Sequence, residues 1–351
     1  MTDTSNVNPE WESLSPELRT SLSAAWRNDV PPTATALYGR WWQLETWLRS
    51  LVYVELRAAF GPAWVEELPD ISGKRQELEH TIRHMPTPDS QARLAYADVS
   101  ALFKIIEKHW SLFEDSLIAR TIWMGRAEEL LHIRNRIGHC RRPHIDDLSR
   151  LEQTLRDLEV GAFRALSSFN RLMNVYPDRR DPVVDAWFVG EHEVAKRLLE
   201  HARRQYETAF ELSWSRRPWS EAISANVPIT GTRGYVWHAE LYFHDRTPRL
   251  RDFWNDDYLG HHRESILLLC ANSPSSFSIS FAALENPSVI ADVIGICFDV
   301  ALTNMRGRHR EVEDDWRRWA KQNADLDPRV QAGGMWAMVS DSTKPIALFA
   351  A

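Results

Sequence analysis

The residues between positions 131 and 144 combine two side-chain types that can act on a phosphodiester bond. Four arginines and three histidines lie in these fourteen residues, although the whole chain has a formal net charge of −7. An arginine stays charged and can bind a phosphate through two N–H groups. A histidine, with an ordinary pKa of about 6.5, can accept and donate a proton near neutral pH. The acidic balance argues against nonspecific nucleic-acid binding over the whole surface, but it leaves room for a local basic site.

Arg134 and His139 are the two residues on which we expect the chemistry to depend. Arg134 falls at helical spacing on a row of apolar residues, Trp123, Ala127 and Leu130. A charge beside an apolar face cannot simply be solvated, so it needs a partner or a site. His139 lies close to Gly138 and Pro143, which predict the end of the helix. Five steps of about 100° turn the two side chains to different faces, so a distorted helix end or a second copy of the chain must bring them into one pocket.

The first half of the sequence has the apolar periodicity of helices almost throughout. Apolar residues recur at helical spacing from Thr33 to Phe60, and Gly61-Pro62 then ends the pattern. The same periodicity predicts three further helices, at 92–113, 116–137 and 146–173. Asp146 or Asp147 can cap the last of them. Four long helices with short connections predict a helical bundle.

The second half has a different pattern. Two prolines in the segment Val175–Pro182 predict a linker, and we expect a helix at 190–212 after it. Short β-prone runs follow, at 235–243, 265–270 and 276–281. The last run alternates polar and apolar residues strictly, as a half-buried strand does. Further helices and a strand are expected at 289–305, 311–323 and 334–339.

The predicted fold is therefore mainly α. It consists of a helical domain over residues 1–175 and a smaller α+β domain over residues 183–351. The polar, acidic N-terminus has no signal-peptide pattern, and the apolar runs are too short to span a membrane. Three widely spaced cysteines, Cys140, Cys270 and Cys297, suggest neither a disulfide framework nor a metal site. We expect a soluble, cytoplasmic protein that binds no membrane.

The run Arg134-Asn-Arg-Ile-Gly-His139 resembles the motif of the HEPN family of helical domains. That motif has an arginine, a polar residue that is often asparagine, and a histidine after a gap of about four to six residues, near the end of a late helix. Trp42-Gln-Leu-Glu-Thr-Trp-Leu-Arg-Ser-Leu-Val52 and Gly61-Pro-Ala-Trp64 are similar to the early helix of one subgroup. Ile145–Leu155 resembles the helix that follows the motif. The resemblance covers roughly residues 1–175, with an HEPN-like helical bundle as the implied fold.

The resemblance implies a metal-independent endoribonuclease that needs no cofactor and acts as a homodimer through this domain. The 2′-hydroxyl of RNA would attack the phosphate, leaving a 2′,3′-cyclic phosphate and a 5′-hydroxyl. His139 would act as general acid and base, Arg134 would hold the scissile phosphate, and Asn135 would orient either the phosphate or His139. Such domains are typical of toxins and antiviral-defence effectors, which implies an antitoxin or regulatory protein as a further partner.

Further basic residues are expected to contact the RNA backbone without reading its sequence, namely Arg136, Arg141, Arg142 and His144. The alternative is that this charge merely complements the dipole at a helix end, and His139 too can be a plain helix-terminal histidine. Asn135 is equally compatible with a surface position. The aromatic cluster Trp41, Trp42 and Trp47 is expected to pack in the core rather than to stack on bases.

Glu45 corresponds to the family's recurrent acidic position on the early helix. It would orient Arg134 or His139, but an ion pair with Arg49 at spacing i,i+4 is the favoured alternative. Other clusters in the second half carry less information. Histidines and aspartates between 238 and 262 match no known metal-site spacing. A basic run at 306–310 fits RNA contact and a solvated turn equally well, and the apolar segment 345–351 is expected to dock on the body or on a partner.

Two functions of different class compete with cleavage of RNA. A non-catalytic HEPN module could dimerise, act as a scaffold or bind nucleotides, and the C-terminal half could itself be an enzyme. The presence of Arg134, Asn135 and His139 together favours the ribonuclease, because a scaffold does not need this set.

Overall fold

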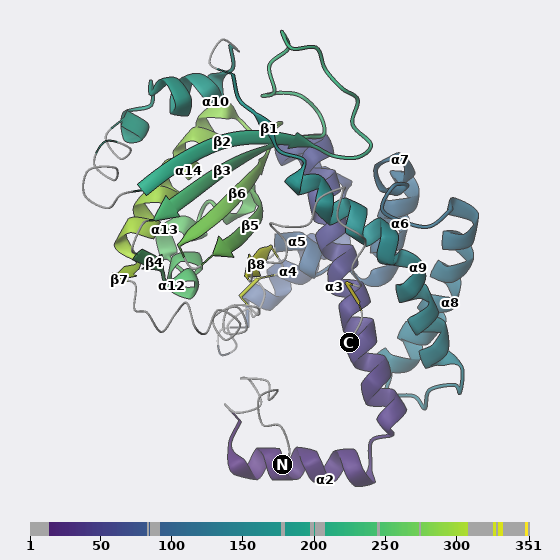
Figure 1. The fold of residues 1–351 in the computed structure, drawn as a ribbon. Coiled ribbons are helices and arrows are strands. Elements are labelled where there is room, and N and C mark those ends of the chain that lie inside the picture. Colours follow the sequence, from purple (N-terminus) through teal and green to yellow (C-terminus); the bar gives the residue numbers. More distant parts are fainter. Residues whose placement is uncertain are drawn as a thin grey trace.

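The structure is a computed structural model that describes residues 14–82, 84, 92–176, 180–196, 200, 208–243, 246–273, 275–307, 326–327, 329–332 and 348–349. A helical part and a β-sheet lie side by side (Figure 1). The long helix α3 (Pro32–Phe60) runs from the end of the helical part that is remote from the sheet up to the sheet itself. Helix α2 (Pro16–Asn28) precedes it and projects at the remote end.

Helix α3 is placed by strong local signals at both ends. Pro32 is its first residue, where the fixed φ of proline suits a helix and its missing N–H costs nothing. Gly61 ends it with φ 57°, and a Cβ at this position would also lie 2.9 Å from the Leu284 backbone oxygen. The predicted helix at 33–60 is therefore confirmed. Its fully buried face repeats with helical spacing, at Leu37, Leu44, Leu48, Val52 and Leu56.

Shorter helices surround α3. They are η2 (Gly61–Glu67), α4 (Asp70–His80), α5 (Ala92–Ala95), α6 (Val99–Lys108), α7 (Trp110–Phe113), α8 (Arg120–Gly138) and α9 (Asp147–Ser167), followed by η3 (Ser168–Asn170). The prediction of one helix at 92–113 was wrong, because Asp98 caps α6 by accepting from the Ala101 N–H and His109 leaves helical geometry. The helix predicted at 116–137 is confirmed as α8. The helix predicted at 146–173 is α9, which ends earlier than predicted, at Ser167.

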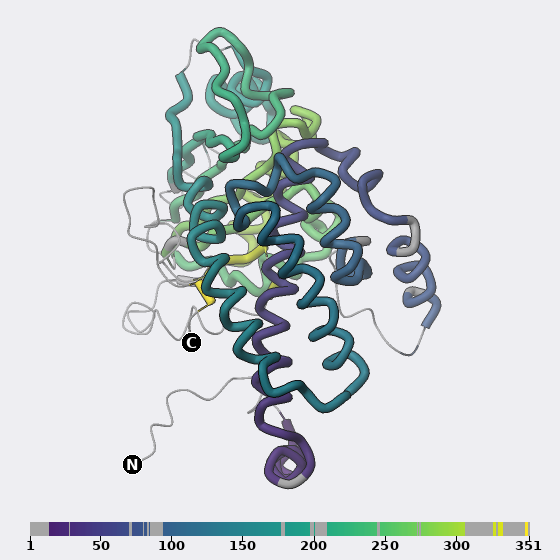
Figure 2. The backbone as a smooth tube through the Cα atoms, turned by 90° about the vertical axis from the view of Figure 1, so that its right-hand side faces the viewer, coloured from purple at the N-terminus to yellow at the C-terminus, as the bar shows by residue number. Residues whose placement is uncertain are grey.

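Helices α8 and α9 run antiparallel beside α3, and their connection lies at the end of the bundle remote from the sheet (Figure 2). Their apolar faces join one buried cluster with α3, including Leu44, Trp123, Leu130 and Leu155. Gly161 brings α9 so close to the loop between α7 and α8 that a Cβ would lie 2.2 Å from the Ser116 backbone oxygen. The helical bundle that the sequence predicts is thus the architecture of the first half.

The second half builds a six-stranded sheet in the order β1-β2-β3-β6-β5-β8. The strands are β1 (Met173–Asn174), β2 (Thr208–Arg216), β3 (Tyr235–Phe243), β5 (Ile266–Ser273), β6 (Ser276–Ala282) and β8 (Val330–Ala332). All described neighbours pair antiparallel except β5 and β8. A separate ribbon pairs β4 (Arg246–Pro248) with β7 (Met305–Gly307). The remaining elements are α10 (Pro182–Val184), η4 (Asp185–Val189), α12 (Leu250–Trp254), α13 (Asp257–Gly260), η5 (Arg263–Ser265) and α14 (Pro287–Thr303).

Two expectations for the sheet were wrong. The helix predicted at 190–212 cannot reach its end, because Thr208–Arg216 forms strand β2 between β1 and β3. The strand Ser276–Ala282 is buried on both faces rather than one. Phe277, Ile279 and Phe281 pack in the cluster of α14, while Ser276 and Ser280 on the other face are buried as well. The short strands predicted at 235–243 and 265–270 and the helix predicted at 289–305 are confirmed as β3, β5 and α14.

The C-terminal half of α3 joins the two parts through buried polar contacts. The Glu55 carboxylate pairs with Arg217, and their side chains are 0% and 1% exposed. Arg57 pairs with Glu285, where the exposures are 6% and 3%. The Tyr53 hydroxyl donates to the Glu264 oxygen at 2.7 Å. The sheet is therefore fixed to the bundle and is not a loosely tethered module.

Some expectations stay open. The helix at 311–323, the strand at 334–339, His244, Asp245 and most of the basic run at 306–310 lie outside the described residues. The predicted division into domains 1–175 and 183–351 stays a prediction. Strand β1 lies before residue 175 and nevertheless pairs with β2 of the sheet. Among the described helices none has the length and apolar content needed to cross a bilayer.

Candidate functional site

The chain turns sharply where α8 ends. Gly138 is the last helical residue, His139 caps the helix, and Cys140 has φ 50°, in the left-handed region. The Cys140 N–H donates to the Ile137 oxygen at 3.1 Å, and the Arg141 N–H donates to the Arg136 oxygen at 2.8 Å. These two bonds form a Schellman motif, in which glycine is the usual left-handed residue. The motif places His139 on the outside of the turn.

Arg134 lies in a pocket of 250 Å³ between α3 and α8. The lining residues are Tyr38, Trp41, Trp42, Glu45, Thr46, Arg49, Arg134, Ile137 and Gly138. The guanidinium lies against Gly138, because a Cβ there would be 3.6 Å from Arg134 Nη1. Arg134 is half-buried, and within the described part of the chain it has no hydrogen bond or ion pair. Its charge therefore borders the pocket without an ion-pair partner among the described residues.

Glu45 lines the same pocket, but its carboxylate is occupied. It accepts from Trp41 Nε1 at 2.6 Å and forms an ion pair with Arg49, one turn along α3. Arg49 also donates to the Ala97 oxygen at 3.3 Å. The ion pair expected as the alternative for Glu45 is confirmed. Its predicted orienting contact with Arg134 is absent from the hydrogen bonds and ion pairs of the described residues.

His139 does not join Arg134 inside this pocket. It follows Gly138, which lines the pocket, but the His139 side chain is exposed and lies outside the lining set. This agrees with the different helix faces expected from five residues of spacing. A single chain therefore brings together Arg134 and Glu45, and places His139 and the exposed Asn135 outside the pocket.

Arg136 belongs to a structural contact. Its Nε donates to Asp147 Oδ2 at 2.7 Å, and a second guanidinium nitrogen donates to the other carboxylate oxygen. The His144 N–H donates to Asp147 as well, at 2.9 Å. Burial favours a higher pKa for the Asp147 carboxyl, but the bonds from Arg136 and His144 outweigh it and lower this pKa below its ordinary value. Arg136 thus ties the end of α8 to the start of α9, while its role in RNA binding stays a prediction.

The remaining basic residues surround the helix end on the surface. Arg141, Arg142 and His144 are exposed. The ring of His144 accepts from the Asp146 N–H at 3.3 Å, and its Nδ1 lies 3.7 Å from the Asp146 carboxylate. The contact of Arg141, Arg142 and His144 with the RNA backbone stays a prediction.

The aromatic residues of the pocket depart from expectation. Trp41 is 5% exposed and packs in the core, as predicted. Trp42 is 59% exposed, and its neighbour Tyr38 one turn away is 54% exposed. The core position predicted for Trp42 was therefore wrong, and Tyr38 was not among the predicted site residues. A helical wheel of α3 could have indicated them, because both lie away from the Leu44 and Leu48 row.

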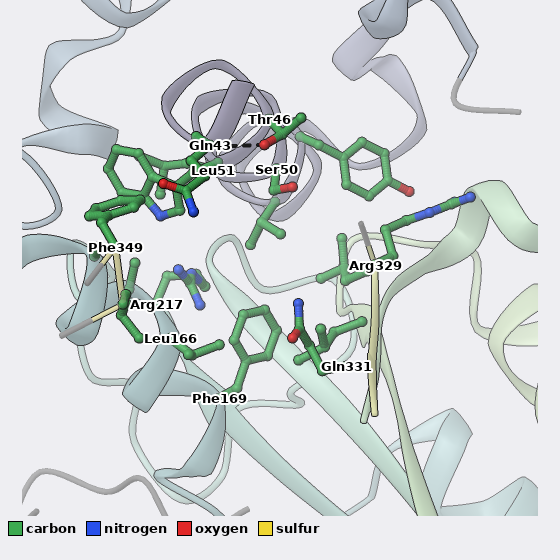
Figure 3. A pocket seen from close by; sticks show the side chains of 18 residues that line it. Gln43, Thr46, Ser50, Leu51, Leu166, Phe169, Arg217, Arg329, Gln331 and Phe349 are labelled. Atoms are coloured by element: carbon green, nitrogen blue, oxygen red, sulfur yellow. Dashed lines mark hydrogen bonds between the residues drawn. The ribbon is translucent and has the colours of Figure 1, made fainter. Parts of the chain in front are cut away.

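A second cavity, of 340 Å³, lies on a different side of α3, between α9 and the sheet (Figure 3). Arg217 and Arg329 border it together with apolar residues such as Leu166 and Phe169. Both guanidiniums have protein partners: Arg217 bonds Glu55 and Ser168, and Arg329 bonds Asp327 and the Arg263 oxygen. Their charges are therefore balanced, whereas Arg134 has no such partner among the described residues.

The expected docking of segment 345–351 on the body is confirmed for Leu348 and Phe349. Their backbone N–H groups both donate to the Glu159 carboxylate, and Arg40 donates to the Phe349 oxygen. The Phe349 ring packs edge-on against Trp47, with ring centroids 5.4 Å apart. Leu348 and Phe349 form part of the wall of the second cavity (Figure 3).

The described histidines and acids of the second half do not assemble into a metal site. His238 is buried between Ser215 and Ser280, with a 2.8 Å contact to each hydroxyl. Burial, with a smaller effect of Arg217, lowers the pKa of His238 to about 3. The described residues contain no group of three histidine, cysteine or acidic side chains that could hold a metal ion.

Comparison with known proteins links the site to one family. Neither the curated proteins nor the solved structures gave a match. The family model described as Swt1-like HEPN matches residues 42–160. This range contains Glu45, Arg134, His139 and nearly all of α8 and α9 with their connection. Residues 42–160 of this chain therefore form a HEPN domain.

Proposed function

We propose that this HEPN domain is a metal-independent endoribonuclease. The observation that carries the proposal is Arg134, a half-buried cation with no partner among the described residues, in a pocket at the helix end that also carries His139. A charge held out of water without a counter-ion is costly, so a protein retains one where an anionic ligand supplies the counter-charge. Family membership supports a ribonuclease-type or nucleotide-related function.

The chemistry follows from the side chains. The 2′-hydroxyl attacks the adjacent phosphorus and loses its proton to a His139 imidazole, while a second imidazole or the same one in turn protonates the departing 5′-oxygen. The products are a 2′,3′-cyclic phosphate and a 5′-hydroxyl. Arg134 holds the phosphate and stabilises the charge that grows on its oxygens. No step needs a metal ion, and Asn135 is assigned to orient the phosphate or His139.

The position of His139 leads us to propose a homodimer. Since His139 lies outside the pocket of its own chain, a second copy would bring its His139 to the open side of the Arg134 pocket. Arg141, Arg142 and His144 surround the same helix end and would hold the RNA backbone beyond the pocket. The arrangement supplies one cation and one imidazole to each phosphate, from different chains.

We also propose a cytoplasmic effector role, as a toxin or antiviral-defence nuclease held by a regulatory partner. The three free cysteines suit a reducing compartment. The buried junction of α3 with the sheet supplies a route by which a partner of the second half could influence the pocket.

The test uses purified full-length protein and labelled single-stranded RNA, with and without EDTA. We expect cleavage that resists EDTA and leaves 2′,3′-cyclic phosphate ends. Arg134→Ala should lower the rate about 100- to 1000-fold, and His139→Ala about 100- to 10,000-fold. His132→Ala and Arg164→Ala, exposed changes on α8 and α9, serve as matched controls. Cleavage that needs a metal ion, or full activity in His139→Ala, would remove the proposal.

A mixture of Arg134→Ala and His139→Ala chains tests the dimer separately. If each site takes its arginine from one chain and its histidine from the other, mixed dimers hold one intact site. Activity should then return to roughly a quarter of the wild-type rate on statistical mixing. An inactive mixture with proven subunit exchange would place both residues of a site in one chain.

One observation favours a second candidate function. Because His139 does not line the Arg134 pocket, the domain could bind a nucleotide there without cleaving RNA. Binding of a nucleotide that depends on Arg134, in a protein that leaves RNA intact, would select this alternative.

A further inference from the structure

Two aromatic rings on the wall of the Arg134 pocket face solvent. Trp42 and Tyr38 lie one turn apart on α3, with ring centroids 6.3 Å apart and planes inclined by 40°. They are 59% and 54% exposed, whereas Trp41 between them is 5% exposed. Leaving a large apolar ring in water forgoes the stabilisation that burial gives. The rings are therefore candidates for contact with a ligand.

The pocket combines these rings with cationic groups. Trp42, Tyr38 and Arg134 all border the same 250 Å³ space, so one small ligand can touch all three. The carboxylate of Glu45 in this space is already paired with Arg49. The charge left without a partner among the described lining residues is that of Arg134. The pocket thus offers a positive point beside a flat apolar surface.

Few ligands use both features. A free phosphate would contact the guanidinium and leave the rings in water. An uncharged aromatic molecule would cover the rings and leave Arg134 without a counter-ion. A nucleotide has an anionic phosphate and a flat base a few ångströms apart, so it satisfies both groups at once.

We infer that Trp42, assisted by Tyr38, stacks on an unpaired base of the RNA whose phosphate Arg134 holds. The inference rests on the proposed function and specifies its substrate as single-stranded RNA. A pocket of 250 Å³ admits one base but no base pair within a duplex. Stacking uses the π-face that every base has, so the site tolerates different base sequences.

The test measures binding apart from cleavage. A fluorescently labelled, single-stranded 2′-O-methyl oligonucleotide lacks the attacking hydroxyl, and its affinity for the full-length protein follows from fluorescence anisotropy. We expect Trp42→Ala to weaken binding about 5- to 150-fold, the range for loss of one stacked base. Trp42→Phe should recover most of the affinity. Phe188→Ala, which removes a ring 51% exposed on η4, should bind as the wild type does.

A second probe isolates the base. An oligonucleotide of equal length with abasic sugars keeps the phosphates, so its weaker binding should be the same for wild type and Trp42→Ala but should fall in Arg134→Ala. Sedimentation of each variant reports its oligomeric state. Equal loss of both probes in Trp42→Ala, or a change in its mass, would overturn the inference and assign Trp42 to the fold or to an interface between copies.

The outcomes separate this inference from the ribonuclease proposal. If Trp42→Ala binds the 2′-O-methyl strand normally while Arg134→Ala does not, stacking is wrong and the phosphate clamp stands. If RNA is never cleaved but Trp42→Ala and Arg134→Ala both weaken binding, the ribonuclease proposal is wrong and the stacking surface stands as part of a nucleotide-binding site.

Discussion

The two ends of helix α3 lie in different electrostatic surroundings. In the C-terminal half, Glu55 and Arg57 are buried and each has a partner of opposite charge in the second half of the chain. In the N-terminal half, α3 forms one wall of an open pocket whose other wall carries Arg134, without a partner among the described residues. The chain itself supplies the carboxylates that pair with Arg57 and Arg217, whereas the described residues supply none to Arg134, which fits the phosphate-binding role proposed for it.

The aromatic residues follow the same division. Tyr53 and Trp64 near the sheet are buried and meet edge to face, with ring centroids 5.2 Å apart. Trp42 and Tyr38 at the other end remain in solvent. The end of α3 at the sheet is therefore closed by the fold, and the end beside α8 is left open.

The free energy of unfolding should distinguish the paired arginine Arg217 strongly from Arg134. Glu55→Ala leaves Arg217 buried and unpaired, so the free energy of unfolding should fall by about 3–5 kcal/mol. Arg134→Ala removes a cation that lacks a partner, and should change it by less than about 0.5 kcal/mol. Urea denaturation followed by circular dichroism measures both. Equal destabilisation by the two variants would show that Arg134 is a structural residue.

The ion pair of Arg136 and Asp147 lies directly beside the candidate site and should have an effect on stability between those two. Asp147→Asn should lower stability near neutral pH by about 1.5–3 kcal/mol, the range for hydrogen bonds to a charged group. The pKa of Asp147 is lower in the folded protein than its ordinary value of 3.8. Its contribution is therefore present above about pH 4 and is lost as the pH falls through the folded pKa.

Denaturation at a series of pH values between about 7 and 2 checks this sign. The wild type should lose stability more steeply than Asp147→Asn below about pH 4. Parallel curves would mean that the Asp147 carboxyl titrates alike in the folded and unfolded chain. The pair of Arg136 and Asp147 would then not stabilise the fold.

Much of the bundle follows from local sequence signals. Pro32 and Gly61 mark α3 almost to the residue, and the apolar row of Trp123, Ala127 and Leu130 places Arg134 beside the core. Strand β3 matches its predicted range for a similar reason, because its β-prone run is long and uninterrupted. In these segments local propensity and tertiary packing favour the same structure.

Other features depend on partners distant in sequence. Residues 208–212 continue a helical pattern, but antiparallel pairing with residues 239–243 of β3 makes them a strand. Trp41 and Trp42 are adjacent and identical in type, but Trp41 lies beside the apolar row of α3 and is buried, whereas Trp42 lies away from it and is exposed. Arg134 and Arg136 are two positions apart on α8. The Asp147 carboxylate, beyond the turn, pairs with Arg136, whereas Arg134 has no ion pair among the described residues.

Variants of Gly138 test whether the Arg134 guanidinium lies against this residue. A Cβ at Gly138 would lie 3.6 Å from the guanidinium, an ordinary contact, so Gly138→Ala should retain cleavage and gain up to about 1 kcal/mol of stability. The branched side chain of Gly138→Val needs the space of the guanidinium, and should lower the cleavage rate more than about 10-fold. Cleavage assays with denaturation curves test both variants. Full activity in Gly138→Val would show that Arg134 need not lie where the structure places it.

The smallest effect concerns the turn that carries His139. Cys140 occupies the left-handed position of the Schellman motif, which costs a residue with a Cβ about 1 kcal/mol or more. Cys140→Gly should therefore raise the free energy of unfolding by about 0.5–1 kcal/mol, and Cys140→Val should lower it because a β-branched residue fits this conformation worst. Differential scanning calorimetry resolves both changes. Since the turn sets the direction of His139, Cys140→Gly should retain cleavage and Cys140→Val should reduce it. Unchanged stability and cleavage in Cys140→Val would mean that the chain leaves α8 by another turn. The exposed position of His139, from which we propose a second copy of the chain, would then lose its structural basis.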